Sequence, residues 1–331
     1  MNNFIQYLEI KNFKSIRYLK LSNFKKINLF IGRPNVGKSN ILEALGLFTL
    51  PYVNMNNGKL QLKKIKNLVR LENESELFYE GNTSSSISIK TNNFQCIISR
   101  NPEENSFDYT NYPKLLHEKG YYIYFSEDLK KEGYPVKSYH FKTGVNFKRE
   151  KVEFLMPPFG NNILQTLDFL PDLKETIAYW FSQYGLRIVF DKASQSLKIM
   201  KEVHDNEVFI IPYNSIADTL QRIIFYKTAI ASNQNSVLVF EEPEAHSFPP
   251  YITEFTQEVI ESTSNQFFMA THSPVIVTDF LENARKDLAI FMVDFKDGQT
   301  VIRSLQETEI EDVYKYGIDL FFNNEAYPVI K

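Results

Sequence analysis

The residues of this sequence that are best suited to chemistry form one short loop, which reads Gly-x-x-x-x-Gly-Lys-Ser over residues 32–39. Glycines at both ends let the backbone curl so that its N–H groups point inward at phosphate oxygens. Lys38 would reach the β- and γ-phosphates of a nucleoside triphosphate, and Ser39 would place a hydroxyl on Mg²⁺. The loop therefore predicts a triphosphate-binding site.

The segments on either side of the loop support this interpretation. An apolar strand pattern at residues 27–31 precedes it, and a helical pattern at residues 41–48 follows it. A helix that begins near Lys38 would aim its positive N-terminal end at the same anion. We expect this helix to end near Pro51, because proline cannot continue it. The predicted nucleotide contacts are Gly32, Arg33, Pro34, Asn35, Val36, Gly37, Lys38, Ser39 and Asn40.

A pair of acidic residues, Glu241 and Glu242, follows a continuous apolar run at residues 237–240. Such a run is typical of a strand buried on both faces, and ligands bind at the carboxyl ends of such strands. We assign Glu241 to Mg²⁺ and Glu242 to the attacking water, as orienting group and general base. A solvated acidic turn is the alternative.

His272 follows a second apolar strand pattern, at residues 265–270. A histidine at the end of a strand could donate a hydrogen bond to the γ-phosphate or contact the attacking water. A lone histidine usually has a structural role, and it is the position of His272 downstream of Glu242 that favours a functional one.

The composition restricts the class of protein. The chain has 331 residues, 43% of them apolar, and a net charge of −3, so its bulk field does not attract polyanions. Cys96 is the single cysteine, which rules out an internal disulfide and favours a reducing compartment. The N-terminus has no signal pattern and no apolar run approaches ~20 residues, so we expect a cytoplasmic protein that does not span a membrane.

Strand patterns alternate with helix patterns along most of the chain, which predicts an α/β fold. Residues 51–154 differ, since short runs of period 2 dominate there. Elsewhere a helix is expected over residues 215–230 with Ser215 as its N-cap, and a last helix over residues 309–322. Two strands around a short turn are expected within residues 4–31. The remaining predicted strands are residues 86–90, 94–98, 121–125, 186–190, 197–201 and 208–211. Further helices are expected after residue 163, after Pro171 and over residues 251–261.

Four motifs together resemble the ATP-binding-cassette ATPase head of structural-maintenance-of-chromosomes (SMC), RecF-like and overcoming-lysogenisation-defect proteins. They are residues 8–15 (LEIKNFKS), 31–45 (IGRPNVGKSNILEAL), 240–246 (FEEPEAH) and 270–274 (ATHSP). The resemblance implies a P-loop NTPase with a mixed central sheet and flanking helices. Residues 1–50 and 155–331 would form the head, and residues 51–154 a mostly β lateral insertion.

The resemblance also assigns functional roles. It implies that Glu242 is the catalytic glutamate, that His272 is the switch histidine, and that Lys14 touches nucleotide. For Lys14, a surface lysine is the alternative. It further implies a homodimer in which each head's signature motif completes the ATP site of the other. The signature candidate here is Ser215, although the glycines that usually follow the serine are replaced by Ile216 and Ala217. His246, Pro249 and Pro250 match the family's subunit-facing loop; a loop stiffened by proline with a structural histidine is the alternative.

We expect nucleic acid as a candidate partner, because one stretch is rich in basic residues and a second mixes basic with aromatic residues, as backbone grooves do. A solvated charged face is the alternative for each. The first stretch holds Lys59, Lys63, Lys64, Lys66 and Arg70; the second holds Lys137, Lys142, Lys148 and Arg149 among Tyr134, Tyr139, Phe141 and Phe147.

Three functions compete. The first is an ATPase head that dimerises on ATP and drives a nucleic-acid-directed complex, with anti-phage defence implied by resemblance. Since the chain ends soon after the last predicted helix, we expect any nuclease or Toprim effector to be a separate protein. The second is an ATP-gated scaffold that does not hydrolyse, motivated by the altered signature. The third is a GTPase switch, which the missing Asn/Thr-Lys-x-Asp motif disfavours.

Overall fold

The computed structural model describes residues 4–53, 65–100, 115–118, 121–125, 135–204 and 207–329. Its chain forms two compact units, of which the first holds Met1–Ser138, Asn235–Glu242 and Asn265–Lys331, and the second Tyr139–Gln234 and Pro243–Ser264. Within the first unit, β4 (Ile87–Thr91) pairs with β1 (Tyr7–Phe13), which joins the segment after residue 65 to the N-terminal strands.

The first unit contains a mixed sheet in the order β15-β14-β3-β13-β12-β8. The strands β12, β13, β3 and β14 run parallel, and β15 runs antiparallel to β14. This confirms the predicted mixed central sheet of an α/β fold. Their bounds are Ile27–Ile31 for β3, Val136–Tyr139 for β8, Val237–Glu241 for β12, Gln266–Ala270 for β13, Leu288–Lys296 for β14 and Gln299–Ser304 for β15.

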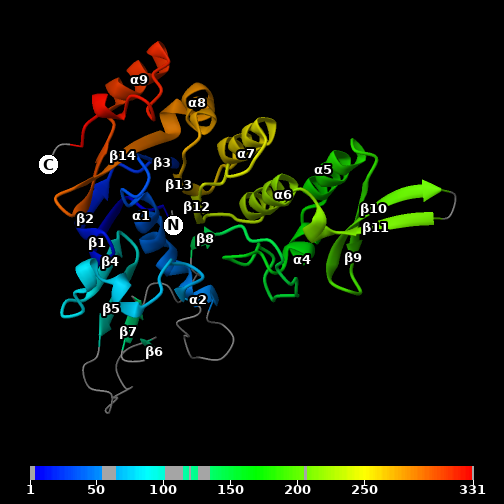
Figure 1. Cartoon of the computed structure of the whole chain (residues 1–331), viewed down its shortest axis with the longest axis horizontal. Helices are drawn as coiled ribbons and strands as arrows, with labels where there is room; N and C mark the ends of the chain where they lie inside the picture. Colours follow the sequence, from blue (N-terminus) through cyan, green and yellow to red (C-terminus); the bar gives the residue numbers. More distant parts are fainter. Residues whose placement is uncertain are drawn as a thin grey trace. The chain divides into compact units, whose positions relative to one another are not determined.

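A second sheet of this unit is antiparallel, in the order β2-β1-β4-β5-β7-β6. Helix α1 (Lys38–Gly46) contacts β1 of this sheet and β12 and β13 of the mixed sheet, so it packs between the two (Figure 1). The other strands of the antiparallel sheet are β2 (Ile16–Ser22), β5 (Gln95–Arg100), β6 (Leu115–Glu118) and β7 (Tyr121–Phe125).

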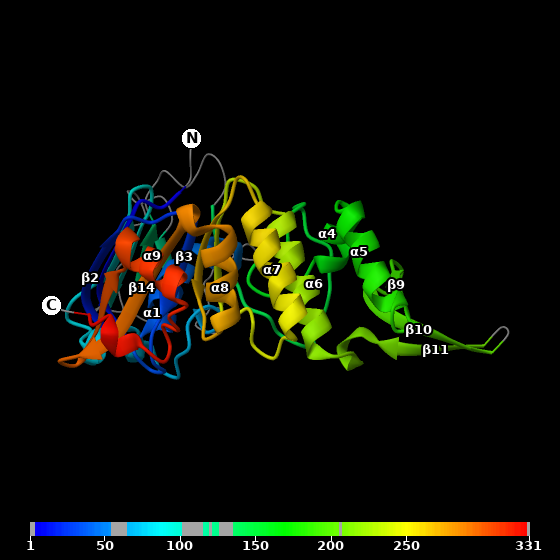
Figure 2. The ribbon, with the colours of Figure 1, turned by 90° about the horizontal axis from the view of Figure 1, so that it is seen from above.

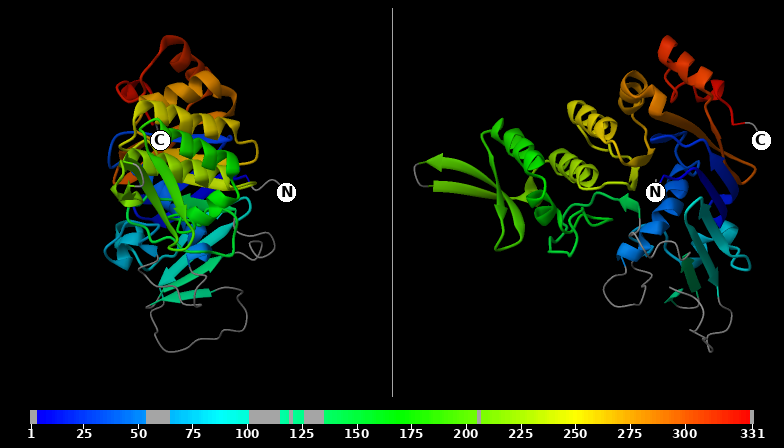
Figure 3. Two further views of the ribbon diagram at one scale, coloured as in Figure 1. Left: turned by 90° about the vertical axis from the view of Figure 1, so that its right-hand side faces the viewer. Right: turned by 180° about the vertical axis from the view of Figure 1, so that it is seen from behind.

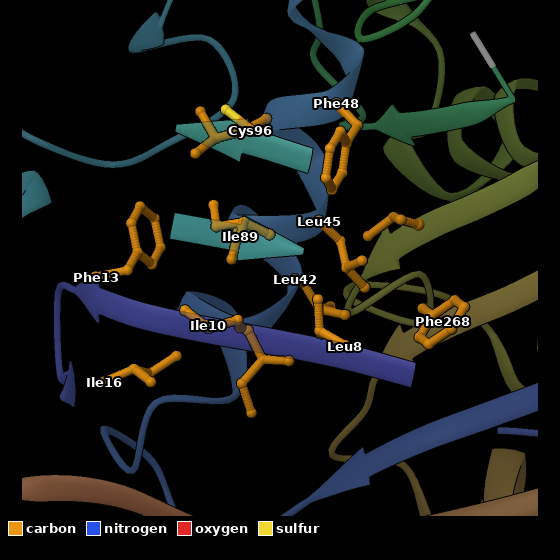
Figure 4. Close-up of a cluster of buried hydrophobic side chains, with 14 of the residues drawn as sticks. Leu8, Ile10, Phe13, Ile16, Leu42, Leu45, Phe48, Ile89, Cys96 and Phe268 are labelled. Atoms are coloured by element: carbon orange, nitrogen blue, oxygen red, sulfur yellow. The ribbon is translucent and has the colours of Figure 1, made fainter. Parts of the chain in front are cut away.

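The apolar faces of these elements form one buried core around α1. Figure 4 shows Leu42 and Leu45 of α1 between Leu8 and Ile10 of β1 and Phe268 of β13. All of them are less than a tenth exposed. At about 25 cal/mol per Å² of apolar surface, such burial stabilises the position of α1, and hence of the loop that precedes it.

Three predicted helix boundaries are wrong. Helical backbone continues past Thr49 into α2 (Leu50–Val53), because Pro51 occupies the first turn of a new helix, where its missing N–H costs nothing. Helix α6 begins at Asp218 rather than Ser215. Helix α9 (Glu307–Tyr316) ends before residue 322, because Gly317 adopts the left-handed conformation that terminates helices. The elements α8 (Pro274–Asn283), β14 and β15 were not predicted.

The second unit consists of helices and a small antiparallel sheet in the order β11-β10-β9. Helices α5, α6 and α7 of this unit lie side by side (Figure 2). Ile177, Trp180 and Phe181 form the buried face of α5. The bounds are α4 Ile163–Asp168, α5 Pro171–Ser182, β9 Arg187–Asp191, β10 Ser196–His204, β11 Glu207–Pro212, α6 Asp218–Ala231 and α7 Pro249–Glu261.

Candidate nucleotide-binding site

The predicted phosphate loop connects β3 to α1. All five residues of β3 are buried, and α1 begins at Lys38. Gly37 has φ 102°, and a Cβ atom there would lie 2.0 Å from the Thr300 hydroxyl oxygen. A Cβ at Gly32 would lie 2.2 Å from the carbonyl oxygen of Val293. Both glycines are therefore required by close packing against β14 and β15, in addition to the curl of the loop.

A chain of hydroxyl groups supports the loop from β15. Thr300 Oγ1 donates to the carbonyl oxygen of Val36 at 3.0 Å and lies 2.6 Å from Ser15 Oγ. Asn40 Nδ2 donates to Ser15 Oγ at 2.6 Å. Sequence reasoning missed Thr300, because nothing local marks a residue more than 260 positions from the loop that it supports.

The Lys38 side chain lies along the loop. Its Nζ donates to the carbonyl oxygens of Gly32 and Arg33, both at 2.8 Å. Burial lowers the pKa of the Lys38 ammonium to about 8, against the opposing effect of the Glu242 and Glu241 carboxylates. The Lys38 ammonium therefore lies close to the loop N–H groups and the N-terminus of α1. All three favour the binding of an anion.

The rest of the loop is more open. Arg33, Pro34 and Asn35 are exposed, and Arg33 pairs with Glu325 at 2.7 Å. Val36 is buried, while Ser39 and Asn40 are half-buried in the first turn of α1.

The acidic pair lies at the carboxyl end of β12, as predicted. Glu241 is the last residue of the strand, and its carboxylate contacts the guanidinium of Arg70. Glu242 turns away with φ 43°, and its N–H donates to the carbonyl oxygen of Ala270 at 2.9 Å. The Glu242 side chain is 48% exposed and Glu241 only 15%, so the two carboxylates have different environments.

His272 follows β13, the strand next to β12, and its Nε2 lies 3.6 Å from Glu242 Oε1. Burial and the ammonium of Lys38 lower the pKa of the His272 imidazole, so the ring is neutral at pH 7. Parallel neighbouring strands thus bring the two residues together.

Lys14 belongs to a partly buried ion pair beside the loop. Its Nζ lies 2.5 Å from Glu43 Oε2 and donates to the carbonyl oxygen of Arg70 at 2.7 Å. The Arg70 N–H donates to Glu43 Oε1 at 3.1 Å. Burial raises the pKa of the Glu43 carboxyl, although Lys14 opposes this. Glu43 was not predicted; its position one helical turn after Ser39 was the available signal.

These groups surround one pocket of about 310 Å³. Among its lining residues are the predicted Lys14, Lys38, Ser39, Glu242 and His272. The pocket is also lined by Pro34, Asn35, Gly37, Asn40, Glu43, Arg70 and Ala270. Its mixture of buried ammonium groups, a hydroxyl and carboxylates suits a phosphorylated ligand with a divalent cation.

The hydroxyl of Ser39 and the carboxylate of Glu241 are oxygen ligands of the kind that Mg²⁺ prefers. Among the described residues no group of three or more histidine, cysteine, aspartate or glutamate side chains is arranged to hold a metal ion. Magnesium in nucleotide sites takes few protein ligands and the rest from phosphates and water, so this donor set fits it.

Ser215 lies in the second unit, and the predicted N-cap role is wrong. It is exposed and ends a 3₁₀ turn, Tyr213–Ser215. The N-cap of α6 is Ala217, and the first turn contains Asp218 instead. A carboxylate there competes with a phosphate for the helix N-terminus. In the same unit, the carbonyl oxygen of His246 accepts a hydrogen bond from Thr219 at 2.7 Å.

The basic stretches also differ from prediction. Arg70 faces Glu241 and Glu43 in the pocket. Lys137 is only 6% exposed, because it points from β8 toward Ser236, to which its Nζ donates at 3.0 Å. Tyr139 is buried as well. Lys59, Lys63, Lys64 and Tyr134 lie outside the described residues.

Comparisons with known proteins agree with this fold. Residues 4–157 match a family described as an AAA ATPase domain. An SMC head bound to the C-winged helix domain of ScpA is 15% identical, with 93% of this chain and 99% of that chain covered and a TM-score of 0.52. An SMC head from Pyrococcus furiosus, bound to the C-terminal domain of ScpA, is 14% identical over 95% and 99%, with a TM-score of 0.50. No relative was found among curated proteins.

The fold is therefore that of a P-loop ATPase head of the ATP-binding-cassette class. Within that class it is similar to the heads of SMC proteins. No helix among the described residues is long and apolar enough to cross a membrane.

Proposed function

We propose that this chain binds ATP with Mg²⁺ and hydrolyses it. The observation that carries the proposal is the convergence of Lys38, Ser39, Glu242 and His272 on one pocket. Loop N–H groups and the Lys38 ammonium would hold the β- and γ-phosphates. Bound Mg²⁺, held by Ser39 and Glu241, would withdraw charge from the phosphate oxygens.

Glu242 is the general base in this proposal. Water attacks the γ-phosphorus, the bond to the β–γ bridging oxygen breaks, and the proton of the water passes to the Glu242 carboxylate. Its exposure suits this role, because half of the side chain is open to the pocket and to solvent. Neutral His272, beside Glu242, would orient the carboxylate or donate to a γ-phosphate oxygen.

Phosphate release with ATP and Mg²⁺ tests this function. We expect Glu242→Gln to lower the rate by about 10²- to 10⁴-fold with ATP binding retained. Lys38→Ala should lose binding, and Glu175→Gln, on the exposed side of α5, should change neither. If the wild-type protein binds ATP but releases no more phosphate than Glu242→Gln, the non-hydrolysing scaffold is correct. Preferential binding of GTP would favour the GTPase.

We further infer that two copies associate through ATP, with Ser215 and the loop at His246, Pro249 and Pro250 facing the nucleotide of the other copy. The similarity to SMC heads supports this proposal. Glu242→Gln should accumulate an ATP-bound dimer, detected as an ATP-dependent mass increase in light scattering. Ser215→Ala should reduce hydrolysis without lowering ATP affinity; an unchanged rate would remove Ser215 from the site.

A separate effector protein and nucleic acid complete the proposal. The SMC heads that this chain resembles hold a domain of ScpA, a different protein. By analogy, the head would gate an effector of nuclease or Toprim type in the cytoplasm, in defence against phage. Co-purification of the protein product of a neighbouring gene, with and without ATP, tests this part.

A further inference from the structure

The outer edge of the small sheet in the second unit is a strand that lacks a neighbour on one side. Among the described strands, β11 pairs only with β10. Alternate residues of an antiparallel edge strand direct their N–H and C=O groups away from the sheet. Figure 3 shows the hairpin of β10 and β11, in light green, extending beyond the helices of its own unit.

The side chains of this edge are apolar. Val208, Phe209 and Ile210 are 52%, 60% and 53% exposed, and Val203 on β10 is 49% exposed. No charged residue occurs between Glu207 and Pro212. Proteins usually protect an exposed edge with lysines, bulges or inward-pointing charges. The register shift in this hairpin lies on β10, between Glu202 and His204, so β11 itself stays regular.

We propose that β11 pairs with β11 of a second copy of this chain, in antiparallel orientation about a two-fold axis at Phe209. A two-fold axis through an antiparallel pair places one residue opposite itself. Centring on Phe209 puts Val208 opposite Ile210 and Glu207 opposite Ile211 of the second copy. Residues 207–211 then all pair, and Pro212, which has no N–H to donate, stays outside.

Charge also favours a second copy as the occupant. Glu207 is the charged residue of β11, and it stands at the N-terminal end of the strand. Antiparallel self-pairing places the two Glu207 carboxylates at opposite ends, about 13 Å apart along the strand direction, so like charges do not meet. The apolar residues between them contact one another, which creates a six-stranded sheet across the axis.

Cross-linking in the absence of nucleotide tests the register. Directly opposed residues in antiparallel strands have Cα atoms about 4.5 to 5.5 Å apart, within the range of a disulfide. We expect Phe209→Cys to form a covalent dimer under mild oxidation. Glu207→Cys is the matched control and should form no covalent dimer, because the two substituted positions lie at opposite ends of the paired strands. The native Cys96 is buried and does not interfere. Equal cross-linking of the two variants would overturn the proposal.

A charge exchange tests the pairing without covalent chemistry. We expect nucleotide-free wild-type protein to dimerise with rising concentration in sedimentation velocity, weakly, because one strand pair is a small interface. Phe209→Lys and Phe209→Glu should each stay monomeric, and their mixture should dimerise again. Phe169→Lys, at a 52% exposed phenylalanine of the same unit, is the control and should behave as wild type.

The same experiment contains the outcomes that contradict the proposal. A wild-type protein that is monomeric at every concentration would overturn it, as would a dimer that persists in Phe209→Lys. Because ATP is absent throughout, neither result depends on the proposed ATPase activity.

Discussion

Thr300 fills the space directly behind Gly37, so that a Cβ atom at Gly37 would lie 2.0 Å from Thr300 Oγ1. The same hydroxyl donates to the carbonyl oxygen of Val36. The loop between β3 and α1 is therefore held from β15, and its shape depends on a residue of another strand.

Thr300→Val should weaken ATP binding by about five- to tenfold, because one buried hydrogen bond of about 1 to 1.5 kcal/mol is lost. Thr300→Ser keeps the hydroxyl and should retain most of the affinity. Titration calorimetry with ATP and Mg²⁺ measures both. Equal affinities for the valine and serine variants would show that the hydroxyl does not support the loop.

Arg70→Ala should lower the Mg²⁺ concentration needed for half-maximal ATP hydrolysis severalfold. The Arg70 guanidinium contacts the carboxylate of Glu241, and a cation there opposes the approach of a divalent ion. Hydrolysis rates measured over a range of Mg²⁺ concentrations give this half-maximal concentration. Lys66→Ala is the control, because the Lys66 Nζ donates to the carbonyl oxygen of Glu72 and not to a carboxylate of the site. A higher Mg²⁺ requirement would mean that Arg70 assists cation binding.

His272→Ala should lower kcat by about 10- to 100-fold and leave KM nearly unchanged, because in the proposed mechanism His272, which lies beside Glu242, acts after ATP has bound. Steady-state kinetics of the single variants and of His272→Ala with Glu242→Gln provide the measurement. If both residues act on one water, the double variant should be scarcely slower than Glu242→Gln. Fully multiplicative effects would contradict a shared role.

Lys137→Met should raise the free energy of unfolding and remove the dependence of this free energy on pH that Lys137 causes. Burial lowers the pKa of Lys137 to about 7, against 10.5 in the unfolded chain. Between these values the unfolded state binds more protons, so the free energy of unfolding rises with pH across this window and is lowest below pH 7. Below pH 7, the burial of Lys137 lowers the free energy of unfolding by on the order of a few kcal/mol.

Urea unfolding of wild type and Lys137→Met at pH 6 and pH 9 checks this sign. The difference between the two proteins should be larger at pH 6. Lys201→Met, at an exposed lysine of β10, should leave the pH dependence as it is. The prediction would be contradicted if the difference in unfolding free energy between Lys137→Met and the wild type were smaller at pH 6 than at pH 9.

The candidate site was predictable where its residues are adjacent in the chain or end a buried strand. The phosphate loop needs its residues in one contiguous stretch, so residues 32–39 are visible in the sequence. Glu242 and His272 follow apolar runs, and neighbouring parallel strands bring their carboxyl ends to one edge. Alternating strand and helix patterns predicted the α/β core, and the resemblance to ATP-binding-cassette heads implied its mixed sheet.

The start of α6 was not predictable in this way. Ser215 has the right residue type for an N-cap, yet the backbone makes a 3₁₀ turn there and the helix begins at Asp218. Residue preference at a helix start is worth only about 1 kcal/mol, so the packing of the surrounding chain decides the boundary.

By itself, the sequence determined the predicted phosphate loop, the strand and helix on either side of it, and the residue types at the ends of β12 and β13, since these depend on local spacing and on buried apolar runs. Tertiary structure alone decided that Thr300 supports the loop, that Arg70 faces Glu241 and that Lys137 is buried. Each of these partnerships joins residues far apart in the chain. Whether a charged side chain meets solvent, a carboxylate or a buried strand is set by the element packed against it, which local sequence does not specify.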